Sequence, residues 1–125
     1  MLKDYFAGAE GTGYLATADE SGQVDIAVFA RPHVLAENTI GFIMTDHLTH
    51  HNLTVNPYAA YLFAENGSRT KGMRLMLRKV SEEKNSELLH QLHRRPHNQP
   101  DIDHFLVVFS VEKILPLVGA GQSSR

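Results

Sequence analysis

The sequence contains no cysteine, which excludes disulfide bonds, thiolate metal sites and cysteine nucleophiles. It also lacks an apolar run that is long enough to span a bilayer. The start of the chain has no apolar core of the kind found in secretory signal peptides. We therefore expect a cytoplasmic protein without a membrane partner.

Neither sign of charge predominates. The 12 lysines and arginines and the 14 aspartates and glutamates give a formal net charge of -2, so no basic bias predicts a nucleic-acid partner. At 125 residues, 42% of them hydrophobic, the chain is long enough to bury one core. We expect a single domain over residues 1–125, with residues 119–125 as a flexible tail.

Short apolar segments separated by turn residues predict a mainly β protein. From Val24 to Ala30 the apolar residues alternate at the period of two that is typical of a strand. Pro32 cannot donate to a strand ladder and predicts an edge or a bend, after which Val34 and Leu35 are interpreted as a continuation of the same strand. The six predicted strands are Tyr14–Ala18, Val24–Leu35, Ile40–Thr45, Tyr58–Ala64, Met73–Val80 and His104–Val111.

Two short helices are predicted between these strands. One runs from His47 to Val55, with Asp46 as its N-cap and Pro57 beyond its end. The other covers Ser86–His93, where the leucines recur at helical spacing, and ends before Pro96. Strands that are joined mostly by turns favour an antiparallel sheet closed into a barrel over a parallel sheet.

Four segments, taken in order, resemble the FMN-binding split barrels of the pyridoxamine 5'-phosphate oxidase-like superfamily over about residues 10 to 118. They are Gly13–Asp19, Ala27–His33, Phe42–Pro57 and Lys71–Val80. The resemblance implies a six-stranded antiparallel split β-barrel (α+β) with two short helices. It also implies FMN as the cofactor and a homodimer with two flavin sites at its interface.

The resemblance places the flavin phosphate at the start of the helix that follows the third strand, where free N–H groups and the helix dipole favour an anion. Thr49 and His47 are the expected side-chain donors there. Family members often carry a lysine or arginine in this segment, whereas this chain has none between Arg31 and Arg69. His47 or Arg31 would then supply the positive charge. The cofactor-binding residues expected are Val28, Phe29, Ala30, Arg31, Ile43, Met44, Thr45, His47, Leu48, Thr49, Asn52 and Arg74.

Other combinations of polar residues give weaker signals. His47, His50 and His51 share a helix face, but no carboxylate is spaced to complete a metal site, so we predict a solvated face and no metal. Gly8, Gly11 and Gly13 precede a strand and open no helix, so they are interpreted as a loop and not as a dinucleotide fingerprint. No side chain stands out as a catalytic base or nucleophile.

The leading functional hypothesis is an FMN-dependent oxidoreductase whose second partner is a nicotinamide or another small organic molecule. The same residues would serve a non-catalytic flavin carrier or an electron-transfer protein. The absence of a phosphate-binding arginine also leaves open a flavin-free module that handles haem. The sequence does not decide among these alternatives.

Overall fold

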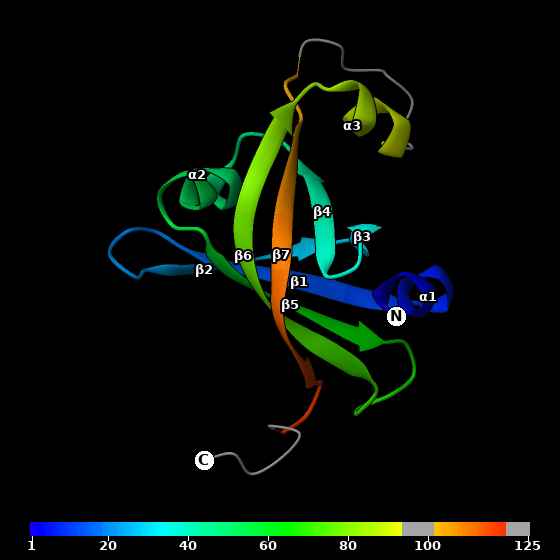
Figure 1. The fold of residues 1–125 in the computed structure, drawn as a ribbon. Coiled ribbons are helices and arrows are strands. Elements are labelled where there is room, and N and C mark those ends of the chain that lie inside the picture. Colours follow the sequence, from blue (N-terminus) through cyan, green and yellow to red (C-terminus); the bar gives the residue numbers. More distant parts are fainter. Residues whose placement is uncertain (94–101, 120–125) are drawn as a thin grey trace.

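The structure is a computed structural model that describes residues 1–93 and 102–119. It is mainly β, with short helices at the ends and sides of one sheet (Figure 1). The helices are α1 (Leu2–Gly8), α2 (Leu48–Val55) and α3 (Glu87–Leu92). The strands are β1 (Gly11–Ala18), β2 (Val24–Phe29), β3 (His33–Ala36), β4 (Thr39–Met44), β5 (Tyr58–Glu65), β6 (Gly72–Lys84) and β7 (Phe105–Pro116).

Every pair of neighbouring strands is antiparallel, and the strand order is β2-β1-β5-β6-β7-β4-β3. The two edge strands, β2 and β3, are therefore consecutive in the chain but lie at opposite edges of the sheet. In Figure 1 the long strands β6 and β7 run through both halves of the sheet, which cross each other. The sheet is open between β2 and β3.

The prediction of six strands was wrong, because residues 1–93 and 102–119 contain seven. Val34 and Leu35 do not continue β2 but belong to β3, in which His33 pairs with Gly41 of β4. Pro32 explains the break, since it has no N–H to extend the ladder that β2 forms with β1. The antiparallel, mainly β class is confirmed, although the sheet is open where a closed barrel was expected.

Helix α1 is a third helix that the sequence analysis did not predict. Leu2, Tyr5, Phe6 and Ala9 follow the helical spacing i, i+3, i+4 and i+7, and Leu2, Phe6 and Ala9 are buried in the core. The Tyr5 hydroxyl donates to a Glu65 carboxylate oxygen at 2.5 Å, which joins α1 to the end of β5. Burial and this carboxylate raise the pKa of Tyr5 to about 12.

The two predicted helices are present as α2 and α3. In α3 the Ser86 side chain caps the helix by accepting from the Leu89 N–H. Within the described ranges no helix has the length and apolar character needed to cross a membrane. Most of the predicted tail at 119–125 lies outside the described residues.

Strands β6 and β7 are longer than predicted. β6 continues past Val80 to Lys84, and the register against β7 shifts between Lys79 and Ser81. A bulge of this kind bends a strand without ending it. The polar residues after Val80 hid this extension from a reading based on apolar runs.

A buried tyrosine fixes the link between the two edge strands. Tyr61 of β5 is 0% exposed, and its hydroxyl donates to the Ala30 carbonyl at 3.0 Å and lies 3.4 Å from the Phe29 carbonyl. Burial raises the pKa of Tyr61 far above its usual range, although the charge of Arg31 acts in the opposite direction. The hydroxyl therefore remains a neutral donor. It holds the end of β2 against β5.

Gly13 makes room for this hydroxyl. A Cβ atom at Gly13 would lie 1.9 Å from the Tyr61 hydroxyl oxygen and 2.6 Å from the Phe29 carbonyl oxygen. Both distances are too short for any side chain. The position that was interpreted as loop is thus a strand residue on which the packing of Tyr61 depends.

We predict that Gly13→Ala lowers the free energy of unfolding by about 1–3 kcal/mol, because the added methyl group displaces Tyr61 or the β2 backbone. Urea unfolding measures this loss. Gly8→Ala is the matched control, since a Cβ at Gly8 meets nothing within 4 Å and alanine favours a helix. Equal stability of the two variants would show that the close approach at Gly13 is absent.

Candidate functional site

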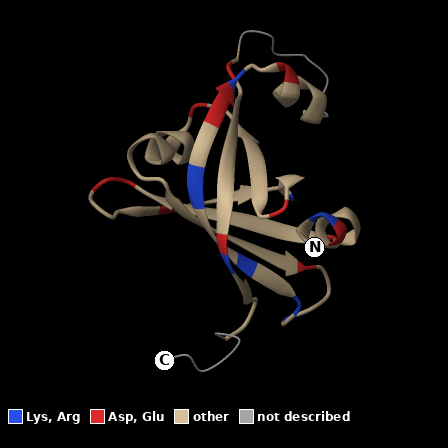
Figure 2. Ribbon diagram, in the orientation of Figure 1, with Lys and Arg blue, Asp and Glu red and all other residues tan. Residues whose placement is uncertain are grey.

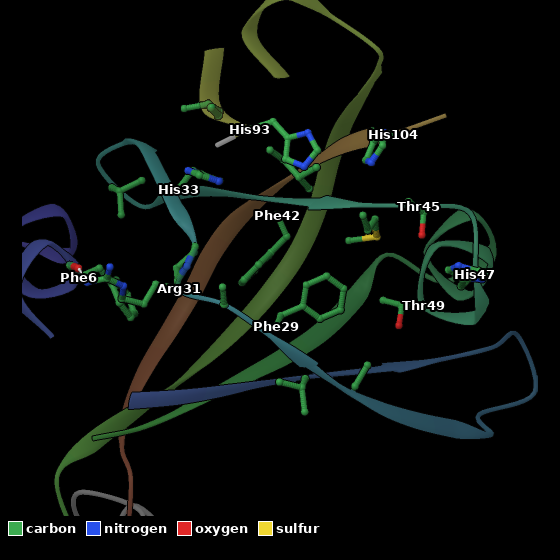
Figure 3. Close-up of a pocket in the computed structure, with 18 of the residues that line it drawn as sticks. Phe6, Phe29, Arg31, His33, Phe42, Thr45, His47, Thr49, His93 and His104 are labelled. Carbon is green, nitrogen blue, oxygen red and sulfur yellow. Dashed lines mark hydrogen bonds between the residues drawn. The ribbon is translucent and has the colours of Figure 1, made fainter. Parts of the chain in front are cut away.

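A pocket of about 1000 Å³ opens beside the link between β2 and β3. Its walls come from β2, the β2–β3 link, β3 and β4, and its ends come from α1 and from the segment that leads into α2. Figure 3 shows Phe29 and Phe42 between Arg31 on one side and Thr45, His47 and Thr49 on the other. The rings of Phe29 and Phe42 meet edge to face with centroids 5.7 Å apart, so the middle of the pocket is apolar.

Nine of the twelve predicted cofactor-binding residues line this one pocket. They are Val28, Phe29, Ala30, Arg31, Ile43, Met44, Thr45, His47 and Thr49. They come from β2, the residues after it, β4 and the start of α2. The fold therefore brings together segments that are up to about twenty residues apart in the sequence.

The other three predicted residues do not line the pocket. Leu48 is 55% exposed on the outside of α2. Asn52 is buried, and its side-chain amide donates to Thr17 Oγ1 at 3.0 Å. Arg74 donates to the carbonyl oxygens of Pro116 and Gly119 near the end of β7. Cofactor binding by Arg74 stays a prediction.

The start of α2 leaves backbone donors at one end of the pocket. His47 is the N-cap and makes no side-chain capping bond, so the first N–H groups of the helix have no intrahelical acceptor. Thr49 is buried, and its hydroxyl lies 3.5 Å from the Asp25 carboxylate of β2. His47 itself is exposed at the rim. Backbone N–H groups and the Thr49 and His47 side chains thus lie at this end of the pocket, and their binding of a phosphate stays a prediction.

Asp46 is not the N-cap that the sequence predicted, because it pairs with a buried histidine. Its carboxylate lies 2.8 Å from His50 Nδ1, while His50 Nε2 faces the Glu82 carboxylate of β6 at 3.1 Å. His50 is only 6% exposed and stacks on Phe105 at 3.9 Å, so the predicted solvated histidine face is wrong at this position. The three side chains join the start of α2 to β6.

Burial and contacts with Lys79 and His50 shift the pKa of Glu82. Burial raises the pKa of its carboxyl group, but hydrogen bonds from Lys79 and His50 outweigh that effect, and the pKa lies below its usual value. The Lys79 ammonium is 2.7 Å from Glu82 Oε1. Figure 2 shows these opposite charges following one another along β6, whereas β4, which forms a pocket wall, carries none.

Arg31 is fixed at the opposite end of the pocket. Its Nη1 donates to the carbonyl oxygens of Phe6 and Ala9, each at 2.8 Å. These carbonyls end α1, which has no basic residue in its own last turn. The guanidinium therefore satisfies the helix end and holds α1 beside the pocket.

The sequence analysis missed the remaining lining residues. Lys3 and Phe6 lie on the unpredicted α1, and His33 begins the unpredicted β3. His93 and His104 lie far along the chain from β2 and β4, which form the pocket walls. Their ring centroids are 4.8 Å apart. The spacing of apolar residues in α1 was the one available signal for this part of the wall.

No aspartate or glutamate is among the described lining residues. Within the described part of the chain, no group of three or more His, Asp or Glu side chains is arranged to hold a metal ion. The pocket is therefore apolar in its middle and basic at its ends, which suits a flat ligand that carries negative charge.

The fold is that of the FMN-binding and pyridoxamine 5'-phosphate oxidase-like split barrels, as the resemblance predicted. The structure is similar to an FMN-binding protein of Syntrophomonas wolfei, with a TM-score of 0.74 and 20% identity over 94% of this chain and 84% of that one. It is also similar to a provisionally assigned pyridoxamine 5'-phosphate oxidase of Lactobacillus delbrueckii, with a TM-score of 0.69 and 16% identity over 90% and 88% of the two chains.

A third similar structure has a different named function. It is the haem storage protein HutZ of Vibrio cholerae, with a TM-score of 0.65 and 18% identity over 97% of this chain and 96% of that one. No protein-family model and no curated protein matches the sequence. At these identities the likeness establishes the fold.

We predict that Glu82→Gln lowers the free energy of unfolding at neutral pH, by no more than about 1 kcal/mol because solvent screens a partly exposed pair. A folded-state pKa below the unfolded one means that ionised Glu82 stabilises the fold above the usual glutamate pKa, about 4.3, and ceases to do so as the pH falls through the lower folded value. The difference between variant and wild type should therefore shrink on acidification.

Urea unfolding at several pH values measures this difference. Glu83→Gln is the control, since no hydrogen bond or ion pair of Glu83 is found in the part of the chain that the structure describes. A loss at Glu82 that did not change with pH would contradict the assignment of the lowered pKa.

Proposed function

We propose that this protein binds FMN in the pocket between β2 and β4 and is a flavin-dependent oxidoreductase. The observation that carries the proposal is that nine of the residues implied by the resemblance line one pocket. The phosphate would lie at the start of α2, held by the first N–H groups of the helix, Thr49 and His47. The ring would lie between the main chain of Val28–Ala30 and the side chains of Ile43 and Met44.

The residues present fit such a ligand. The volume of about 1000 Å³ lies at the upper end of the range for small-molecule sites, and the lining combines apolar side chains with polar and basic ones. No carboxylate is among the described lining residues and Asp46 is turned toward His50, but the Asp25 carboxylate lies 3.5 Å from the Thr49 hydroxyl at the proposed phosphate end. FMN would supply the hydride or electron transfer, and the protein would supply its orientation and electrostatics. A nicotinamide or another small organic molecule is the proposed second partner.

An exposed apolar strip on β2 supports a homodimer. Val24, Ile26 and Val28 are 76%, 67% and 70% exposed, and they point to the same side of an edge strand. Such a strip on an unpaired edge is a liability unless another surface covers it. Val28 also lines the pocket, so a second subunit on this strip would cover the proposed flavin.

The test of FMN binding compares FMN with riboflavin, which lacks the phosphate. Calorimetry should show FMN binding to the wild type, and His47→Ala should weaken FMN about ten- to a hundredfold while leaving riboflavin nearly unchanged. That loss corresponds to one charge-assisted hydrogen bond of about 1.5–3 kcal/mol. Absorbance of the loaded protein should show the flavin bands in the blue and near-ultraviolet.

The matched control is His51→Ala, a change in the same helix at an exposed residue outside the pocket lining. No FMN binding at millimolar concentration would overturn the proposal, and haem binding instead would favour the haem-handling alternative. If His47→Ala weakened FMN and riboflavin equally, the phosphate would be misplaced. Steady oxidation of NADH or NADPH by the loaded protein separates an oxidoreductase from a flavin carrier.

The dimer is tested by Ile26→Asp, which places a charge in the middle of the apolar strip. Light scattering should give the wild type twice the 14.0 kDa mass of one chain. The variant should have the mass of one chain. Val118→Asp is the control, because Val118 is 60% exposed and lies beyond the end of β7. A wild type that is monomeric at micromolar concentration would contradict the dimer.

A further inference from the structure

The end of the pocket beside α1 is basic and has no part in binding the proposed phosphate. Lys3 of α1, Arg31 of the β2–β3 link and His33 of β3 line it. In Figure 3 Arg31 and His33 lie on the side of the pocket opposite to His47 and Thr49. A phosphate at the start of α2 would lie at the His47 end of the pocket, away from this second group of basic side chains.

Arg31 is preorganised to receive an anion. Nη1 carries two hydrogens, and the carbonyls of Phe6 and Ala9 take both. Nε and Nη2 carry the other three N–H donors of the guanidinium, and in the described part of the chain neither atom has a hydrogen-bond acceptor. Capping α1 thus uses one nitrogen and fixes the orientation of the rest. A guanidinium held in this way loses little further rotamer freedom when it binds a ligand.

The surroundings of Arg31 favour an anion over a neutral group. No carboxylate is among the described residues of the lining, so its charge is not compensated within the pocket. The nearby Tyr61 hydroxyl is neutral, because burial raises its pKa far above the usual range. Phe6 and Phe42 line the pocket beside the basic group, and they provide an apolar surface for the body of a small ligand.

We propose that Arg31 and His33, with Lys3 at the rim, form a subsite for the carboxylate or phosphate of a small organic substrate. The substrate would bind with its anionic group at this end and its apolar body against the flavin. The proposal rests on the proposed function for the flavin, but the basic group and the wall beside it are present in the chain itself. The proposed subsite restricts the second substrate of the flavin reaction to organic anions.

Ligand-observed NMR with two probes of the same shape tests the subsite. Benzoate carries the anionic group and benzamide does not, and both are titrated into the FMN-loaded protein and into the protein without FMN. Benzoate should bind the wild type about tenfold more tightly than benzamide, the difference expected for one charge-assisted contact. Phenyl phosphate, as a third probe, shows whether phosphate is preferred to carboxylate.

Three variants show which residues cause the preference for benzoate over benzamide. Arg31→Gln should abolish the preference for benzoate, and His33→Gln should reduce it about threefold. His51→Gln, outside the pocket lining, should leave it unchanged. Because Arg31 also holds α1, benzamide binding and thermal unfolding are measured in parallel, and His33→Gln decides the outcome if Arg31→Gln does not fold.

Two results would overturn the subsite. One is equal binding of benzoate and benzamide by the wild type, or a preference that persists in Arg31→Gln. The other is a loss of FMN but not of riboflavin in Arg31→Gln, because Arg31 would then hold the flavin phosphate. If FMN fails to bind while the protein alone still prefers benzoate, the flavin proposal fails and the anion subsite stands.

Discussion

The hydrogen bond from the buried Tyr61 hydroxyl to the Ala30 carbonyl is the contact on which the geometry of the pocket depends. The two edge strands of the sheet, β2 and β3, are joined by only three residues, yet they pair with different neighbours on opposite edges. Tyr61 holds this link from beneath, and Gly13 leaves the space that its ring needs. Arg31, within the link, holds α1 from the side. The split in the sheet is therefore a fixed opening with two walls and two helical ends.

Charge is distributed so that the opening stays free of carboxylates. Asp46 lies next to the start of α2, where a negative charge would oppose a phosphate, but His50 binds its carboxylate. The Glu82 carboxylate contacts the other ring nitrogen of His50 and forms an ion pair with Lys79. This cluster joins α2 to β6 and so also fixes the position of the helix start. Asp25 of β2 faces Thr49 at the end of the pocket where the phosphate is proposed to lie.

Local patterns were sufficient to predict most of the sheet, because alternating apolar residues and turn clusters act over a few residues. The residues of the two pocket walls were predicted from the resemblance to the split barrels. They failed where tertiary pairing decides the structure. Pro32 marked a break, but only pairing with β4 makes a separate strand of four residues after it. Asn52 was assigned to the cofactor, whereas its place on α2 turns it toward Thr17 in the core. His93 and His104 approach each other through the fold, which no spacing in the sequence reveals.

Backbone amide chemical shifts, recorded while FMN is added, show which residues the ligand contacts. The largest changes should fall on two stretches, Ala27–Arg31 and Phe42–Thr49, which form the walls and the α2 end of the pocket. Saturable binding with its largest changes outside those two stretches, or no change at all, would contradict the assignment of the pocket as a flavin site.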